Sequence, residues 1–196
     1  NNILILGDSV GKDFYISAVS NELLKNSYEF RYVDFDDQCM NLSSMSSKSN
    51  FNCKNILAHL KQSNLLNDAD TIILSAHWEK TSWINPIIFA KELSSQAKIK
   101  IIGSFKVADT SSIAMYSAQK EHSYEDMNKF SFKTIGDDYK YSRRIQEDAK
   151  GIDNVYYHDK LEIFCDSREE KCELFNKKEG FPLIWDNMHI TLEGRE

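Results

Sequence analysis

The chain has 196 residues, a length typical of one domain with a self-sufficient hydrophobic core. Hydrophobic residues make up 41% and charged residues 28%, and no apolar run reaches the roughly 18 residues that a transmembrane helix needs. The net charge of −6 argues against nucleic acid or an anionic membrane surface as a partner.

Short apolar runs alternate with amphipathic segments along the chain. The continuous run Ile3-Leu4-Ile5-Leu6 is typical of a strand buried in a parallel sheet. A helix is expected next, because apolar residues recur near helical spacing at Phe14, Ile16, Val19, Leu23 and Leu24. Further strands are expected at residues 28–35, 70–75, 98–105 and 154–158, and further helices at about 53–62, 82–96 and 141–150, the last capped by Gly151.

The rest of the chain is harder to interpret. Residues 108–140 show no clear pattern, a hairpin turning at Glu179-Gly180 is expected near residues 172–185, and a final helix should follow Trp185. Strands that alternate with helices predict a three-layer α/β/α sandwich with a mainly parallel sheet of about five strands, as in flavodoxin-like folds. Because both ends look cut, we expect residues 1–196 to be one domain excised from a larger protein.

The four cysteines fall into two close pairs, each around a polar loop. Cys39 and Cys53 form the first pair, and Cys165 and Cys172 the second. Neither pair has zinc-site spacing, so no metal site is expected there. Three pairings are possible, and free thiols in a cytosolic protein are the alternative. We expect local pairing into two disulfides, and therefore an oxidising compartment.

Gly7-Asp8-Ser9 follows the first predicted strand, where a sheet of this kind binds ligands. The run Gly7-Asp8-Ser9-Val10-Gly11-Lys12 is one residue too short for a phosphate-binding P-loop, and Asp13 would repel a phosphate. We therefore interpret Ser9 as a nucleophile at a helix N-terminus, whose backbone N–H groups can stabilise an oxyanion.

A serine nucleophile needs a base, usually a histidine oriented by a carboxylate. Of the five histidines, His189 is the best candidate because Asp186 precedes it by three residues. That spacing places both side chains on one side of a helical turn. An N-capping Asp beside an unrelated His is the alternative interpretation of this short motif.

The two motifs together resemble the SGNH (GDSL-like) esterase and acyltransferase family, which opens with Gly-Asp-Ser and closes with Asp-x-x-His. Here these blocks are Gly7-Asp8-Ser9 and Asp186-Asn187-Met188-His189, and the resemblance covers nearly the whole chain. It implies that Ser9 is the nucleophile, His189 the base and Asp186 the orienting acid. It also implies an SGNH-like fold, with the Ser9 amide as one oxyanion donor.

The middle blocks differ from the broad family. Cys39-Met40-Asn41 stands where the second-block glycine is usual, and Ser75-Ala76-His77-Trp78 replaces Gly-x-Asn-Asp. Asn41, a loop amide near Met40, or the side chains of His77 or Trp78 are therefore candidates for the remaining oxyanion donors. Trp78 and Trp185 also fall beside the expected site, where they would either stack on a sugar or pack in the core.

These departures resemble one subgroup, the SGNH domains fused to acyltransferase-3 membrane proteins of bacteria. The resemblance implies a periplasmic or extracellular location and O-acetylation of a surface carbohydrate such as lipopolysaccharide O-antigen. It also implies a membrane acyltransferase domain in the same polypeptide as the acetyl donor, no cofactor, and no membrane insertion by this segment. A secreted carbohydrate acetylesterase with the same triad and a non-enzymatic glycan-presenting domain are the alternatives.

Overall fold

A parallel sheet of five strands forms the centre of the molecule. The computed structural model describes residues 1–40, 51–78, 83–94, 96–103, 123–133, 135, 139–174, 183 and 189. The sheet order is β2-β1-β3-β4-β5, and every neighbouring pair is parallel. The strands are β1 (Asn2–Gly7), β2 (Glu29–Asp34), β3 (Thr71–Ser75), β4 (Lys98–Ile102) and β5 (Val155–His158). This is the predicted α/β fold.

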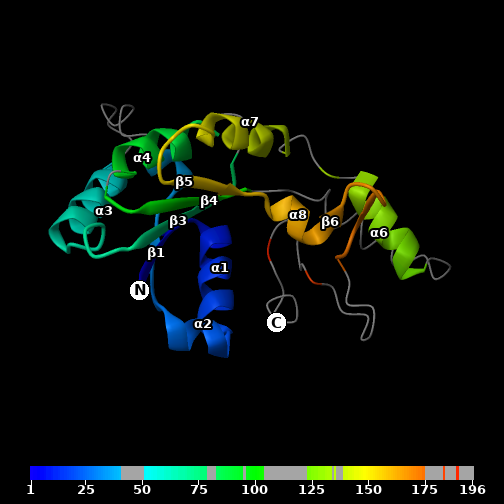
Figure 1. Ribbon diagram of the computed structural model, residues 1–196, viewed down its shortest axis with the longest axis horizontal. Helices are drawn as coiled ribbons and strands as arrows, with labels where there is room; N and C mark the ends of the chain where they lie inside the picture. The colour runs from blue at the N-terminus through cyan, green and yellow to red at the C-terminus, as the bar shows by residue number, and fades with distance from the viewer. Residues whose placement is uncertain are drawn as a thin grey trace.

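Helices lie on both sides of the sheet (Figure 1). Three helices cover one face: α3 (Phe51–Gln62), α4 (Asn85–Leu93) and α7 (Tyr139–Ala149). The other face is covered by α1 (Ser9–Ser20), which is followed by the short helix α2 (Glu22–Ser27). None of the helices in the described part of the chain is both long enough and apolar enough to span a membrane.

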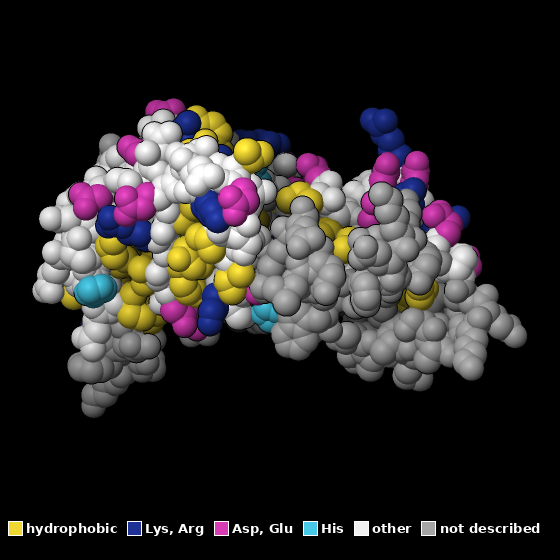
Figure 2. Space-filling view, turned by 90° about the horizontal axis from the view of Figure 1, so that it is seen from below, with side chains coloured by type: hydrophobic (Ala, Val, Ile, Leu, Met, Phe, Trp, Pro, Cys, Tyr) yellow, Lys and Arg dark blue, Asp and Glu magenta, His cyan; other side chains and the backbone are white. Residues whose placement is uncertain are grey.

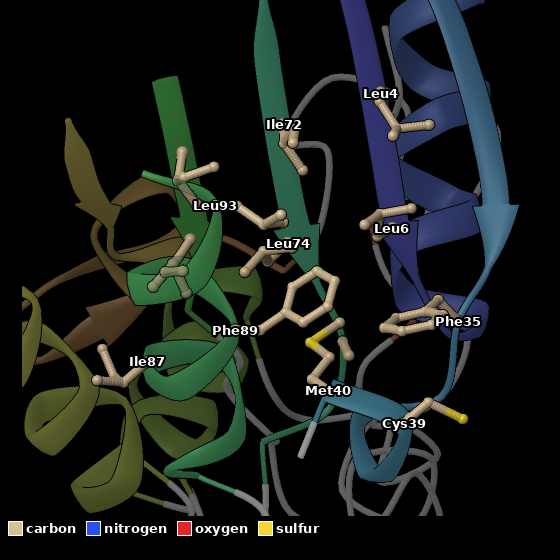
Figure 3. Close-up of a cluster of buried hydrophobic side chains, with 14 of the residues drawn as sticks. Leu4, Leu6, Phe35, Cys39, Met40, Ile72, Leu74, Ile87, Phe89 and Leu93 are labelled. Atoms are coloured by element: carbon tan, nitrogen blue, oxygen red, sulfur yellow. The ribbon is translucent and has the colours of Figure 1, made fainter. Parts of the chain in front are cut away.

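The main core lies between the sheet and the three helices α3, α4 and α7. Leu4, Leu6, Ile72 and Leu74 project from β1 and β3 toward this side (Figure 3). Phe35, which follows β2, meets Phe89 of α4 with their ring centroids 5.4 Å apart. These contacts bury the central strands, as the continuous apolar runs predicted.

The single helix expected after Ser9 is in fact two helices. Asn21 has an extended backbone (φ −81°, ψ 115°), and its side-chain oxygen accepts hydrogen bonds from the N–H groups of Leu23 and Leu24. An asparagine in this role starts a new helix. As a result Leu23 is 79% exposed instead of continuing the buried face of α1.

On the α1 side, a hollow of about 490 Å³ lies between α1 and the sheet. Ile3, Phe14, Phe30 and Ile73 form much of its apolar lining, and Lys98 and Lys100 also line it. Figure 2 looks at this side from below and shows apolar side chains gathered there with charged side chains beside them. Because Asn1, Asp70 and Lys98 also line it, the hollow lies toward the amino ends of the strands, away from Ser9.

A second, smaller cluster lies beyond β5 and contains most of the additional structure that the sequence did not predict. It joins α6 (Tyr124–Lys133), α8 (Lys160–Phe164) and a short hairpin of β6 (Cys165–Asp166) and β7 (Lys171–Cys172). Leu161, Cys172 and Leu174 are its buried centre. The hairpin expected near residues 172–185 is described only at its ends, where the N–H of Leu183 donates to the carbonyl of Leu174 (2.7 Å). Its turn and the final helix lie outside the described residues.

Both predicted disulfides are confirmed, and the described cysteines include no free thiol. Cys39–Cys53 joins the short helix η1 (Asp37–Met40) to α3, and both cysteines belong to the main core. Cys165–Cys172 closes the β6–β7 hairpin of the second cluster. Each bond therefore lies within or beside a hydrophobic cluster.

Reduction should destabilise the protein without any change in metal content. Loops closed by cysteines 14 and 7 residues apart contribute about 2–3 kcal/mol each in the chain-entropy description. For a domain of this size, loss of one bond corresponds to a fall in Tm of roughly 4–12 °C. Thermal unfolding of Cys39→Ser/Cys53→Ser and Cys165→Ser/Cys172→Ser, each with and without reductant, measures the two contributions separately. Unchanged Tm values in both double variants would contradict this expectation.

Candidate functional site

Ser9 lies at the point where the strand order of the sheet reverses direction. β1 ends at Gly7, Asp8 is the N-cap, and Ser9 is the first residue of α1. From β1 the chain continues to β2 on one side, whereas β3, β4 and β5 follow one another on the other side. A crevice is therefore expected between the carboxyl ends of β1 and β3. The Ser9 side chain is exposed there, at the N-terminal end of a twelve-residue helix.

The structure brings His189 to Ser9 from 180 residues away in the sequence. The distance from Nε2 of His189 to Oγ of Ser9 is 2.8 Å, a normal hydrogen-bond length. In the tautomer with its proton on Nδ1, the imidazole accepts the hydroxyl proton of Ser9 through Nε2. This is the geometry that proton removal from a serine nucleophile requires.

Three of the residues expected at the site lie outside the described residues. They are Asp186, the expected orienting acid, Asn41, a candidate oxyanion donor, and Trp185, expected to stack on a sugar or to pack in the core. Met40, which precedes Asn41, is fully buried at the end of η1. The roles of Asp186 and Asn41 therefore stay predictions.

The backbone of Ser75 packs against the turn that carries Ser9. A Cβ added to Gly7 would lie 1.7 Å from the carbonyl oxygen of Ser75, and a Cβ added to Gly11 would lie 2.5 Å from it. Ser75 itself is 2% exposed. The end of β3 therefore packs directly on the turn that carries Ser9, and only glycine permits that approach.

The structure corrects the expectation for Trp78 and leaves that for the His77 side chain a prediction. The backbone N–H of His77 donates to Oδ2 of Asp8 (2.9 Å), so this amide faces the carboxylate and not a substrate oxygen. The Trp78 ring is 0% exposed, and its indole N–H donates to the carbonyl of Ile102 (2.8 Å). This arrangement assigns Trp78 to the core and corrects the expectation that its side chain supplies an oxyanion donor or stacks on a sugar.

Asp8 is a site residue that the sequence analysis missed. Its Oδ1 accepts the N–H of Val10 (2.8 Å), which caps α1, while Oδ2 accepts the N–H of His77. The sequence held one usable signal, because Asp is a preferred N-cap immediately before a helix. The second hydrogen bond joins residues 69 positions apart and has no local signature.

Tyr32 supports the same turn from the neighbouring strand β2. Its hydroxyl oxygen lies 3.0 Å from the carbonyl oxygens of both Gly7 and Asp8, which share its one proton in a bifurcated hydrogen bond. Burial, and then the carboxylates of Asp34, Asp8 and Asp13, raise the pKa of this hydroxyl far above its usual value. Tyr32 therefore keeps its proton at all physiological pH values and acts as a fixed donor.

The described residues contain no group of three or more His, Cys, Asp or Glu side chains placed to hold a metal ion. The Ser9–His189 pair has the donor and acceptor atoms for proton transfer and nucleophilic attack. The arrangement suits acyl transfer, in which a helix N-terminus stabilises the charge on the tetrahedral intermediate.

Comparisons with known proteins agree with this geometry. A family model described as "SGNH domain (fused to AT3 domains)" matches residues 1–196. Among solved structures, the periplasmic domain of a lipopolysaccharide acetyltransferase from Salmonella ser. Paratyphi A has a similar fold, with a TM-score of 0.68. The two share 13% identity, and the match covers 99% of this chain and 78% of that one. No curated protein matches the chain.

Alanine at Gly7 or Gly11 should disturb the fold through the Ser75 carbonyl. We expect Gly7→Ala to lower the free energy of unfolding by about 3 kcal/mol or more, and Gly11→Ala by about 1–3 kcal/mol, since the contacts are with backbone. Helix propensity alone predicts the opposite for Gly11→Ala, a gain of up to about 1 kcal/mol.

The exposed Lys12→Ala in the same helix is the control and should change stability by less than about 0.5 kcal/mol. Chemical denaturation followed by circular dichroism measures all three variants. A Gly11→Ala protein more stable than the native chain would show that the Ser75 contact does not constrain α1.

Proposed function

Since this chain belongs to the family of SGNH domains that are fused to AT3 domains, we propose that it transfers an acetyl group to a carbohydrate hydroxyl through an acyl-enzyme on Ser9. The observation that carries the proposal is the 2.8 Å contact between Oγ of Ser9 and Nε2 of His189 at the switch point of the sheet. The solved periplasmic domain of similar fold is named for a Salmonella lipopolysaccharide acetyltransferase, which supports acetyl as the transferred group.

In the first step Oγ of Ser9 attacks the carbonyl carbon of the acetyl donor while His189 takes the hydroxyl proton. The bond from that carbon to the donor's leaving group breaks, and His189 returns the proton to the leaving group. In the second step a sugar hydroxyl gives its proton to His189 and attacks the acetyl-Ser9 ester. Ser9 is regenerated with its proton, and the product is the O-acetylated carbohydrate.

Asp186 is proposed to hold His189 with its proton on Nδ1 and to stabilise the imidazolium that forms in each step. The oxyanion of each intermediate would be stabilised first by the backbone N–H of Ser9 at the start of α1. Asn41, the amide beside Met40 and the His77 side chain are the remaining candidate donors. This mechanism calls for no organic cofactor.

In this proposal a membrane acyltransferase domain of the same polypeptide supplies the acetyl donor, because the family is described as fused to AT3 domains. The domain would work on the periplasmic or extracellular side of a bacterial membrane. The two disulfides support that location, since such bonds persist in oxidising compartments.

Hydrolysis is a second activity favoured by a specific observation. Ser9 is exposed, so water can reach an acetyl-Ser9 ester whenever no sugar occupies the site. We therefore expect weak acetylesterase activity from the isolated domain. Product analysis separates the two activities, because a transferase yields acetylated sugar when acceptor is present and an esterase yields only acetate.

Ser9→Ala and His189→Ala should each lower acetyl turnover by at least about 10⁴-fold, because each removes a reacting atom. The double variant should be little worse than either single variant, since the residues act as a unit. Release of acetate from 4-nitrophenyl acetate and mass analysis of oligosaccharide acceptors measure both activities.

Two variants serve as matched controls for this experiment. Ser17→Ala removes a hydroxyl from the same helix, where it donates to the carbonyl of Asp13, and His59→Ala removes an exposed imidazole from α3. Both should keep native turnover. A folded Ser9→Ala protein with undiminished turnover would refute the nucleophile, and a native protein inactive on every ester and acceptor would favour a glycan-presenting role.

Asp186→Asn should retain roughly 10–100-fold more activity than Ser9→Ala, because it disturbs the tautomer and charge of His189 and removes no reacting atom. The comparison uses the same acetate-release assay on proteins with matched Tm values. Equal activity of Asp186→Asn and the native protein would remove Asp186 from the triad.

A further inference from the structure

The carboxylate of Asp8 receives two backbone N–H groups from different parts of the chain. Oδ1 accepts from Val10 at 2.8 Å, and Oδ2 accepts from His77 at 2.9 Å. Val10 lies in the first turn of α1, whereas His77 lies two residues beyond the end of β3. One side chain therefore links the helix that begins with Ser9 to the segment on the other side of the crevice.

Helix capping accounts for only half of this arrangement. An N-cap side chain needs a single oxygen to satisfy an N–H in the first turn, and Oδ1 of Asp8 does this. The bond from Oδ2 to His77 adds nothing to the helix. A serine at position 8 would cap α1 equally well and would have no second oxygen for His77.

The backbone around this link leaves little room for Ser9 to move independently. The Ser75 carbonyl packs on Gly7 and Gly11, one residue before Asp8 and three residues after it. Tyr32 donates to the carbonyls of Gly7 and Asp8 from the opposite side. The carboxylate of Asp8 completes this enclosure, and hydrogen bonds to a charged acceptor are stronger than neutral ones.

We propose that Asp8 is a positioning residue that aligns Ser9 by tying the start of α1 to the His77 segment through its two carboxylate oxygens. The role for catalysis rests on the proposed function, whereas the link itself is a property of the fold. Asp8 takes no proton and touches no reacting atom in this role. Its loss acts through the placement of the Ser9 hydroxyl relative to His189 and to the oxyanion position.

Three variants separate alignment from simple capping. Asp8→Ser keeps the cap and loses the link, Asp8→Ala loses both, and Asn21→Ala removes a cap from α2, which is distant in sequence from the site. Each protein is measured for Tm, for kcat and KM with 4-nitrophenyl acetate, and for exchange of the His77 amide proton by NMR. Amide exchange does not depend on any activity.

The expected result is a specific pattern across these measurements. Asp8→Ser should lower Tm by less than Asp8→Ala does, because it keeps the cap, while His77 exchange becomes at least about 10-fold faster because a charge-assisted hydrogen bond is lost. Its kcat should fall by about 10–100-fold with little change in KM, since a small misplacement of reacting groups slows the chemical step. Asn21→Ala should lower Tm and leave kcat and His77 exchange unchanged.

Two results would overturn the proposal. One is native kcat in Asp8→Ser, which would reduce Asp8 to a helix cap. The other is native His77 exchange in Asp8→Ser, which would show that the link does not hold the segment. If the native protein itself has no turnover, the proposed function fails, and His77 exchange still decides whether Asp8 ties the two segments together.

Discussion

The close approach of β3 to the turn after β1 is the constraint on which the site depends. It is possible because Gly7 and Gly11 have no Cβ, and the Ser75 carbonyl occupies the space that a Cβ at either position would fill. With the two strand ends so close, one carboxylate can reach the N–H groups of both Val10 and His77. Ser9 then projects from a turn that packs against the Ser75 carbonyl on one side and is held by the hydroxyl of Tyr32 on the other. Acyl transfer requires such placement, because small displacements of the reacting groups reduce the rate strongly.

The fold could be predicted from the sequence wherever a pattern is local. The continuous run of β1 and the cysteine pairs each reflect nearby residues, and each prediction is confirmed. The prediction of one continuous helix after Ser9 was wrong at Asn21. The apolar spacing continues past this residue, although Asn21 caps a new helix, α2. The second cluster was missed because α6 and β7 pack on one another across a sequence separation of about forty residues, so no local pattern shows that they belong together.

The candidate site shows the same division between local and distant information. Ser9 was predictable because a serine between a strand and a helix is a local pattern. The burial of Trp78 was not predictable, because its indole N–H donates to the carbonyl of Ile102 on the next strand of the sheet. The roles of Asp8 and the two glycines likewise involve partners about 65–70 residues away, which no single window of sequence contains.

The contact between Ser9 and His189 depends on the fold of the whole domain. Ser9 follows the first strand and His189 lies 180 residues later, so the 2.8 Å contact exists only when both ends of the chain are in place. The sheet core fixes Ser9 through β1 and β3, and the hydrogen bond between Leu174 and Leu183 fixes a point on the approach to His189. That approach begins in the second hydrophobic cluster, which the Cys165–Cys172 disulfide closes. The disulfide is remote in sequence from Ser9 and His189, and its Cys172 packs in the same cluster as Leu174, to whose carbonyl Leu183 donates. In the proposed mechanism, its effect on turnover would therefore arise through the position of His189 and not through any contact with substrate.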